Sequence, residues 1–309
     1  MTVDPWGQQA VPSVQAGLTL ADARLRDSPF SRQASEVALK LKVERRALIV
    51  RTLLHLPRVA DDNGQVGWQL AQAELKRCAE ELRADQAKVR GLVSTDSFPL
   101  QDLVFKGDYD STEAETIFSH LHYLRSARQG SRNYALVDPM YGLPVSLCSV
   151  SPLEWKLVGR QLSKQFQIPA AKIWDVSRVY SFEVAPPNAI SYLLARVRSD
   201  LRQKEPTAEL LTTAVDPNLG FTGSSYQAAN WRRWMTVAPR PYLYLNDDYV
   251  TPRQLRTRFS TANLKHIEKK FDQKIAACSP DLLLDSSIFC CRINGATESV
   301  PGELTPLRR

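Results

Sequence analysis

The sequence predicts a mixed α/β protein in which a central mixed sheet is flanked by helices and preceded by a helical N-terminal extension. The 309 residues are 43% hydrophobic and 24% charged, which is typical of a globular chain that can bury a sizeable core. Two long amphipathic patterns occupy residues 33–92, and from about residue 117 short apolar runs alternate with helical patterns. This alternation favours an α/β architecture over a purely helical one.

The N-terminal region is expected to be helical after a loosely ordered lead. Residues 1–30 are rich in Pro, Gly, Gln and Ser and show no sustained periodicity. Residues 33–54 and 66–92 are each predicted to form one helix, with a turn at 61–64 between them. The apolar positions of the first helix are Leu39, Val43, Ala47, Val50 and Leu54. Two helices around a turn fit either a DNA-binding helix-turn-helix or an α-hairpin packed on the next domain.

The second half of the chain is expected to supply the sheet. Strands are predicted at 133–137, 144–150, 176–183, 210–215, 242–245 and 282–293, with a hairpin turn at 138–142. Helices are predicted at 152–166 and 188–201, and a short helix or turn at 224–234. Residues 252–274 are predicted to be a basic helical stretch with a break near Ser260.

Composition suggests a cytoplasmic protein with a polyanionic partner. No apolar run approaches the roughly 20 residues of a membrane helix, and the N-terminus lacks the pattern of a signal peptide. The five cysteines are scattered without a Cys-x-x-Cys pair, so we expect no disulfide framework, and Cys290 and Cys291 are expected to be small buried residues. The net charge of +7 suits nucleic acid or a phosphorylated cofactor such as coenzyme A.

The most informative block runs from residue 211 to residue 231. A predicted strand ends at Asp216, a loop containing Gly220 and Gly223 follows, and Tyr226 opens a short helix. Glycines allow a ligand to approach the backbone closely, and a helix start offers free N–H groups. Tyr226 could donate a proton to a leaving group or fill a pocket.

This block resembles the signature of the Mom-like proteins, which are phage DNA-modification enzymes that alter adenine. It is also similar to the DruA-type proteins of anti-phage systems, and both resemble the GNAT acyltransferase fold. The matching positions are Asp216, Gly223, Tyr226, Ala228, Asn230 and Trp231. Residues 122–126 resemble the family's His-Tyr-x-x-Ser segment, and residues 251–259 its Thr-Pro-Arg-x-Leu-Arg-x-Arg-Phe run. The resemblance covers roughly residues 117–293.

The resemblance implies a domain organisation and a set of site residues. It implies a GNAT-like domain at 111–295, after the lead at 1–30 and a helical region at 31–110, and before a tail at 296–309. The implied catalytic residues are His122, Tyr123, Ser126, Asp216 and Tyr226. The donor would be acetyl-CoA or another acyl-CoA, held at the helix start by Asn188, Ala189, Ile190 and Ser191. The implied substrate-binding residues are Gly223, Asn230, Trp231, Arg253, Arg256 and Arg258, with DNA as the partner.

Several alternatives stay open at this point. Asp216 could cap a turn, Asn188 and Ser191 could cap a helix, and Trp231 and Trp234 could be core residues. His120 and His122 would share a face in a strand, but no third ligand is evident, so no metal is expected.

The function also has more than one interpretation. The leading one is a GNAT-like group transferase that modifies a nucleobase in DNA. Residues 186–191 lack the Arg/Gln-x-x-Gly-x-Gly/Ala pattern that GNAT enzymes use for the donor's pyrophosphate. That departure favours a DruA-like defence component that binds nucleic acid or a partner protein without acyl transfer. A third alternative is acyl transfer to a small-molecule or aminoacyl amine.

Overall fold

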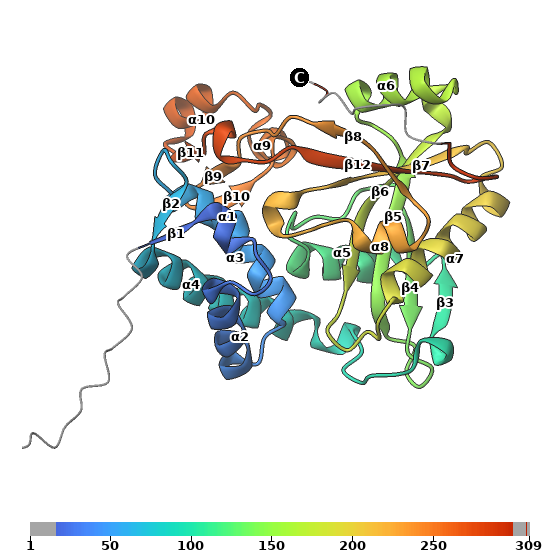
Figure 1. Ribbon diagram of the computed structural model, residues 1–309, viewed down its shortest axis with the longest axis horizontal. Coiled ribbons are helices and arrows are strands. Elements are labelled where there is room, and N and C mark those ends of the chain that lie inside the picture. The colour runs from blue at the N-terminus through green and yellow to red at the C-terminus, as the bar shows by residue number, and fades with distance from the viewer. Residues whose placement is uncertain (1–16, 299–306, 308–309) are drawn as a thin grey trace, which may run out of the picture.

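The computed structural model describes residues 17–298 and Leu307, and Figure 1 shows helices of the N-terminal region packed beside a large twisted sheet. The sheet has seven strands in the order β3-β4-β5-β6-β7-β12-β8. Their bounds are β3 Val104–Gly107, β4 Arg132–Val137, β5 Pro144–Pro152, β6 Ile173–Ser181, β7 Leu210–Val215, β12 Ser286–Arg292 and β8 Arg232–Val237. Every pair is antiparallel except β6–β7, which is parallel. The predicted mixed sheet is therefore confirmed.

The parallel pair separates soon after it begins. Its register contains Ile173↔Leu210, Trp174↔Leu211 and Asp175↔Thr212 and then stops. Strand β6 continues along β5, and β7 continues along β12, so a gap opens between them toward their carboxyl ends. Residue 177 is a bulge, because β5 pairs with the residues on either side of it. Carboxyl ends of neighbouring parallel strands are a common place for ligands in α/β sheets.

Two faces of the sheet are covered by different helices. Helix α7 (Ala189–Lys204) and the short α8 (Ser224–Ala228) pack on one face, with Cys148, Val176 and Phe289 in their core. On the other face α5 (Ser111–Leu121) joins the N-terminal helices, and α6 (Lys156–Phe166) covers Ile288 and Cys290. Neighbouring strand residues therefore face different cores, as the period of two requires. Cys290 and Cys291 are both buried, as predicted.

The N-terminal region is built from four helices and a small ribbon. The helices are α1 Leu20–Ala23, α2 Pro29–Leu41, α3 Arg45–Val59 and α4 Trp68–Val89, and the ribbon pairs β1 Gly17–Thr19 with β2 Gln65–Gly67. The prediction of one helix at 33–54 is wrong, because Lys42 adopts a left-handed conformation with φ 53° and ends α2. Leu39 is consequently 83% exposed rather than buried. Helix α4 confirms the second predicted helix.

The expected loose lead is also corrected in part. Residues 1–16 lie outside the described residues, but residues 17–30 form β1, α1 and the start of α2 and bury Leu18, Leu20 and Phe30. Most of the expected tail, 299–306 and 308–309, lies outside the described residues as well. One apolar core runs from the N-terminal helices to Ala135 and Leu147 of the sheet.

The remaining elements complete the C-terminal half. A three-stranded sheet, β10-β9-β11, is formed by β9 Leu243–Leu245, β10 Asp248–Val250 and β11 Ile275–Ala277. The basic stretch is two helices, α9 Pro252–Phe259 and α10 Leu264–Phe271, with the predicted break between them. Single-turn 3-10 helices are η1 Arg90–Leu92, η2 Leu100–Asp102, η3 Ala170–Lys172, η4 Pro217–Leu219 and η5 Pro280–Leu282. Within residues 17–298, none of the helices combines the length and apolarity needed to cross a bilayer.

Candidate functional site

The gap between β6 and β7 gathers polar side chains from both faces of the sheet. Asp175 is the last residue of β6 that pairs with β7, and the Thr213 hydroxyl on β7 donates to the Val176 carbonyl at 2.9 Å just beyond it. Tyr226 reaches the gap from α8, and its hydroxyl oxygen lies 3.5 Å from that of Thr213. Tyr123 approaches from the opposite face, after α5. Because no strand pairing closes the sheet there, the two tyrosines are within electrostatic reach of each other.

Glycine geometry places Tyr226. Gly223 has φ +79°, and a Cβ at this position would lie 2.3 Å from Cζ of Phe289, so only glycine fits. The Tyr226 ring then packs against Phe289, with ring centroids 5.8 Å apart, and against Trp231, at 5.3 Å. Trp231 and Trp234 are 3% and 2% exposed, which confirms the core alternative for both.

Asp175 is a site residue that the sequence analysis did not select. Its carboxylate lies 3.2 Å from one terminal nitrogen of the Arg128 guanidinium, and the other terminal nitrogen contacts both Glu154 and the Pro152 carbonyl at 3.0 Å. Burial raises the pKa of Asp175 to about 6, although the charges of Arg128 and Arg178 act in the opposite direction. An aspartate three residues before an arginine within a mostly apolar strand was the signal that could have identified it.

Burial also raises the pKa of both tyrosines, so both phenols keep their protons. The charge of Asp175 raises the pKa of Tyr226 and Tyr123 further. The arrangement thus places one carboxyl group that titrates near neutrality beside two phenols that can donate a proton. A base and an acid at one gap are the groups that a proton-coupled group transfer requires.

His122 and Ser126 shape the segment that carries Tyr123. His122 is buried, its Nδ1 accepts the Leu124 backbone N–H at 3.2 Å, and its ring stacks on Tyr123 at 4.4 Å between centroids. Burial, and next the charge of Arg178, lower the pKa of His122 well below its usual value, so the ring is neutral. Arg178 donates to the Ser126 carbonyl at 2.8 Å and to its hydroxyl at 3.2 Å.

His120 and His122 do not lie on a strand, so they do not share the face that a strand would give them. His120 lies in the last turn of α5, and His122 is the residue that ends this helix. Their side chains have different partners, because His120 lies 3.2 Å from Asp85 and His122 accepts from Leu124.

Asp216 caps a turn at the end of β7. Its Oδ1 accepts the Asn218 backbone N–H at 2.9 Å and the Asn218 side-chain amide at 2.8 Å. Its Oδ2 accepts the Tyr242 hydroxyl at 2.5 Å. The charge of Asp216 still raises the pKa of Tyr123, after burial as the main cause. Asp216 therefore borders the site with both carboxylate oxygens already engaged.

The expected donor-binding residues lie at a separate pocket of about 430 Å³ between α7 and α8. Asn188, Ser191 and Asn230 line it, together with Arg198 and Arg202, whereas Ala189 is buried in the core. Asn188 occupies the N-cap position of α7 with φ 67°, but its side chain makes no capping hydrogen bond, and the Ser191 hydroxyl donates to the Asn188 carbonyl at 2.9 Å. Both arginines donate to the Ile293 carbonyl.

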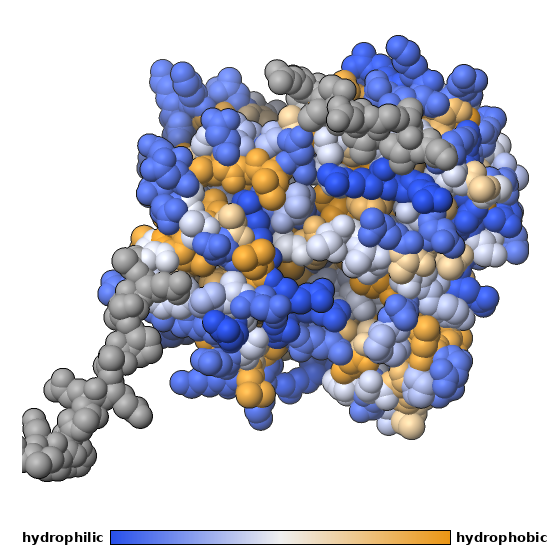
Figure 2. Space-filling model, in the orientation of Figure 1, coloured by the Kyte–Doolittle hydropathy of each residue, from blue (hydrophilic) through white to orange (hydrophobic). Residues whose placement is uncertain are grey.

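The basic helices adjoin the site. Only Leu255 of α9 and Ile267 of α10 are buried, so the charged side chains of both helices face solvent. The exposed basic residues are Arg253, Arg256, Arg258, Lys265, Lys269, Lys270 and Lys274. Figure 2 shows hydrophilic side chains over the outer side of α10. The Gln254 side chain donates to the Leu124 carbonyl at 3.2 Å, which joins α9 to the segment that carries Tyr123.

Fold and site together define the class of protein. It is a mixed α/β protein in which two parallel strands separate beside a carboxyl group with a raised pKa, and two helices with exposed basic residues lie next to this place. Residues 104–279, more than half of the chain, match the Mom protein family. The chain therefore belongs to this family, which is compatible with a phage DNA-modification protein. Comparison with curated proteins gives no match. The matched residues include Tyr123, Asp175 and Tyr226 but not α3 or α4.

Proposed function

We propose that the protein is a GNAT-like acyltransferase that modifies a nucleobase amine in DNA. The observation that carries the proposal is the gap between β6 and β7, with Asp175 at its base and Tyr226 and Tyr123 on its two sides. Membership of the Mom family supports DNA as the substrate class. The resemblance to GNAT proteins suggests a thioester as donor.

In the proposed reaction Asp175 accepts one proton and Tyr226 donates another. The amine nitrogen forms a bond to the acyl carbon, the bond from that carbon to sulfur breaks, and the products are an amide and a thiol. Asp175, in its ionised form, takes the proton that the nitrogen loses. Tyr226 gives its proton to the departing sulfur and regains one from solvent or from Asp175. Tyr123 orients the reacting groups from the opposite face.

The donor fits the pocket between α7 and α8 by charge. Arg198 and Arg202 bring two positive charges to it, and the start of α7 brings the positive end of a 16-residue helix. These features favour a phosphorylated molecule without requiring the glycine pattern that residues 186–191 lack. Coenzyme A would supply a thioester carbonyl that is activated toward amines.

The acceptor side is supported by the basic helices. Arg253 and Arg256 lie on the helix whose Gln254 contacts the 122–126 segment, so phosphates bound there would lie close to the gap. The ring of Phe221 is 39% exposed and lies 5.9 Å from that of Tyr123, which offers an aromatic surface beside the site. Aromatic surfaces of this kind stack on bases that leave the duplex.

Nucleoside mass spectrometry of DNA from expressing cells tests the proposal. Wild-type protein should add a modified nucleoside, and Asp175→Asn and Tyr226→Phe should each reduce its yield by about 10² or more. Asp62→Asn, an exposed carboxylate in the turn before β2, is the matched control and should leave the yield unchanged. Full modification by Asp175→Asn would remove the proposed base from the scheme.

A binding role without transfer is the second candidate. The absent glycine pattern at 186–191 and the engagement of both Asp216 oxygens favour it. It predicts no new nucleoside together with unaltered DNA binding by Asp175→Asn. A third outcome, thiol release from an acyl-CoA with a small amine but not with DNA, would indicate a small-molecule or aminoacyl acceptor.

A further inference from the structure

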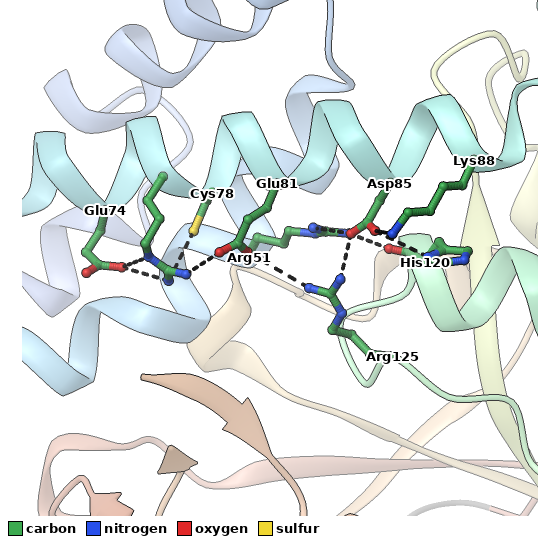
Figure 3. Close-up of polar contacts among 9 residues, drawn as sticks. Arg51, Glu74, Cys78, Glu81, Asp85, Lys88, His120 and Arg125 are labelled. Atoms are coloured by element: carbon green, nitrogen blue, oxygen red, sulfur yellow. Dashed lines mark hydrogen bonds and ion pairs between the residues drawn. The ribbon is translucent and has the colours of Figure 1, made fainter. Parts of the chain in front are cut away.

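A buried carboxylate of the N-terminal helices is bonded to the segment that carries Tyr123. Asp85 lies on α4 and is 2% exposed. Its Oδ2 lies 2.8 Å from a nitrogen of Arg51 and 2.7 Å from one of Arg125. Its Oδ1 lies 3.2 Å from His120 Nδ1 and 3.5 Å from Lys88 Nζ. Figure 3 shows Arg51, Arg125, Lys88 and His120 converging on this one side chain.

Two of these partners flank Tyr123 in the sequence. His120 lies in the last turn of α5, and Arg125 lies two residues after Tyr123. Arg125 has φ 46°, a left-handed conformation that is unfavourable for a residue with a side chain. Its backbone N–H donates to the His122 carbonyl at 2.8 Å, so this conformation closes the turn. The ion pair with Asp85 therefore holds a strained backbone in place.

The backbone at this turn has further anchors. Arg51 also donates to the His120 carbonyl, so α3 holds the start of the segment. On the sheet side Arg178 of β6 bonds to Ser126, and on the side of α9 Gln254 bonds to the Leu124 carbonyl. The anchors from β6 and α9 lie inside the matched residues 104–279, but those from α3 and α4 lie outside them. The N-terminal helices thus supply contacts that the matched part does not contain.

We propose that Asp85 is a positioning residue: it sets the turn at Arg125 and thereby the place of Tyr123 at the gap between β6 and β7. Helices α3 and α4 are then an integral wall of the site and not a separate binding module. The carboxylate is needed because its negative charge pairs with two guanidinium groups at once, as an ion pair with Arg51 and a charge-assisted hydrogen bond from Arg125. An asparagine would offer one oxygen and turn its NH₂ group toward cations. The link to activity rests on the proposed function, whereas the link to the conformation of the turn does not.

The same helix provides a matched control. Glu74 is also buried on α4, at 7% exposure, and is also paired with two arginines, Arg58 and Arg77. Neither arginine belongs to residues 120–126. Glu74→Gln and Asp85→Asn therefore each remove one buried charge from the same helix. Arg77 is linked to Arg125 only through Glu81, which lies 2.5 Å from Arg77 and 3.9 Å from Arg125, so Asp85→Asn removes a direct contact of the turn and Glu74→Gln does not.

Hydrogen exchange by mass spectrometry on the full chain tests the proposal. Asp85→Asn should speed exchange of the Leu124 and Arg125 amides by about tenfold or more, while Glu74→Gln should leave them near the wild-type rate. Equal rates for Asp85→Asn and wild type, or equal acceleration by Glu74→Gln, would overturn the proposal. If Asp85→Asn does not fold, Arg125→Met at the more exposed end of the pair takes its place, with the same expected acceleration and the same overturning result.

The activity measurement separates a positioning role from general loosening. In Asp85→Asn the turnover of modification should fall by about 10², because misplacement of a reacting group by an ångström has an effect of this size. The variant Asp85→Asn/Arg125→Met should lose no more than Asp85→Asn alone, since the ion pair that Arg125→Met removes is one of those that Asp85→Asn already removes. Faster exchange with unchanged turnover would overturn the positioning role. If wild-type protein modifies nothing, the proposed function fails and the exchange rates alone decide whether Asp85 sets the turn.

Discussion

The hydroxyl of Tyr242 donates to Oδ2 of Asp216 at 2.5 Å, and this bond engages the carboxylate oxygen that Asn218 does not contact. The other oxygen of Asp216 accepts from Asn218, so the side chain ties the end of β7 to η4 and to Tyr242, the residue before β9. Asp175, in contrast, has its pKa raised to about 6 and lies where the sheet opens. A carboxyl group with this pKa can exchange a proton with substrate near neutral pH.

The first prediction is that Asp216→Asn lowers stability, whereas Asp175→Asn lowers modification activity. Asp216→Asn should lower the free energy of unfolding by about 1.5–3 kcal/mol, because it weakens charge-assisted hydrogen bonds. Asp175→Asn should abolish modification without that loss, because its carboxyl group is destabilised by burial. Urea unfolding and nucleoside mass spectrometry on both variants check this. A stable Asp216→Asn protein without activity would instead assign the base to Asp216.

The second prediction concerns pH. The pKa of Asp175 is about 6 in the folded protein, above its usual value of about 3.9. The folded state therefore holds the proton of Asp175 up to a higher pH than the unfolded state does. The stability contributed by this protonated carboxyl group is fully present below pH 4 and is lost as pH rises through 6. The loss should be on the order of 2–3 kcal/mol.

Comparison of wild type with Asp175→Asn isolates this contribution. The wild-type free energy of unfolding should fall, relative to the variant, between pH 4 and pH 7. Modification activity should rise over the same window as the base ionises. A parallel pH dependence of stability in both proteins would show that the pKa of Asp175 is not raised by folding.

The third prediction is that two glycines of one loop respond differently to alanine. Gly223 has φ +79°, and the Cβ of an alanine there would lie 2.3 Å from Phe289. Gly223→Ala should therefore lower the free energy of unfolding of the protein by about 3 kcal/mol or more. Gly220→Ala has φ +77°, but the nearest atom, Cδ1 of Leu53, lies at 3.5 Å, so the loss should be about 1–2 kcal/mol. Thermal unfolding of both variants measures the difference. Similar losses would mean that Phe289 moves aside without cost.

The fourth prediction tests the basic helices as a DNA surface. Lys269→Gln/Lys270→Gln on α10 should weaken binding to duplex DNA and reduce the slope of log affinity against log salt by about 1.8. Lys40→Gln/Lys164→Gln, two exposed lysines on α2 and α6, should change neither quantity. Fluorescence anisotropy at several salt concentrations measures both. Equal effects of the two double variants would indicate that net charge alone matters.

The structure shows where local patterns were sufficient. Strand β7 was predicted with its observed bounds, and the hairpin β4–β5 with its turn, because alternation and turn residues are local signals. The break at Lys42 was missed because no glycine or proline marks it. The sequence predicts a helix or turn over 224–234, whereas the structure ends α8 at Ala228 and begins strand β8 at Arg232, because only three residues separate the two elements. Helix α5 and strand β3 were not assigned, although the Asp110 cap of α5 is a local signal.

The candidate site divides in the same way. The family, the sheet, the glycine loop and the exposed basic stretch were determined by the sequence itself, because each depends on residue types at short, regular spacings. Asp175, the turn cap at Asp216 and the anchoring of Arg125 by Asp85 were decided by the tertiary structure. A pKa depends on burial and on charges distant in sequence, and an ion pair between residues 40 positions apart leaves no periodic trace. The raised pKa of Asp175 is therefore a consequence of how the chain packs.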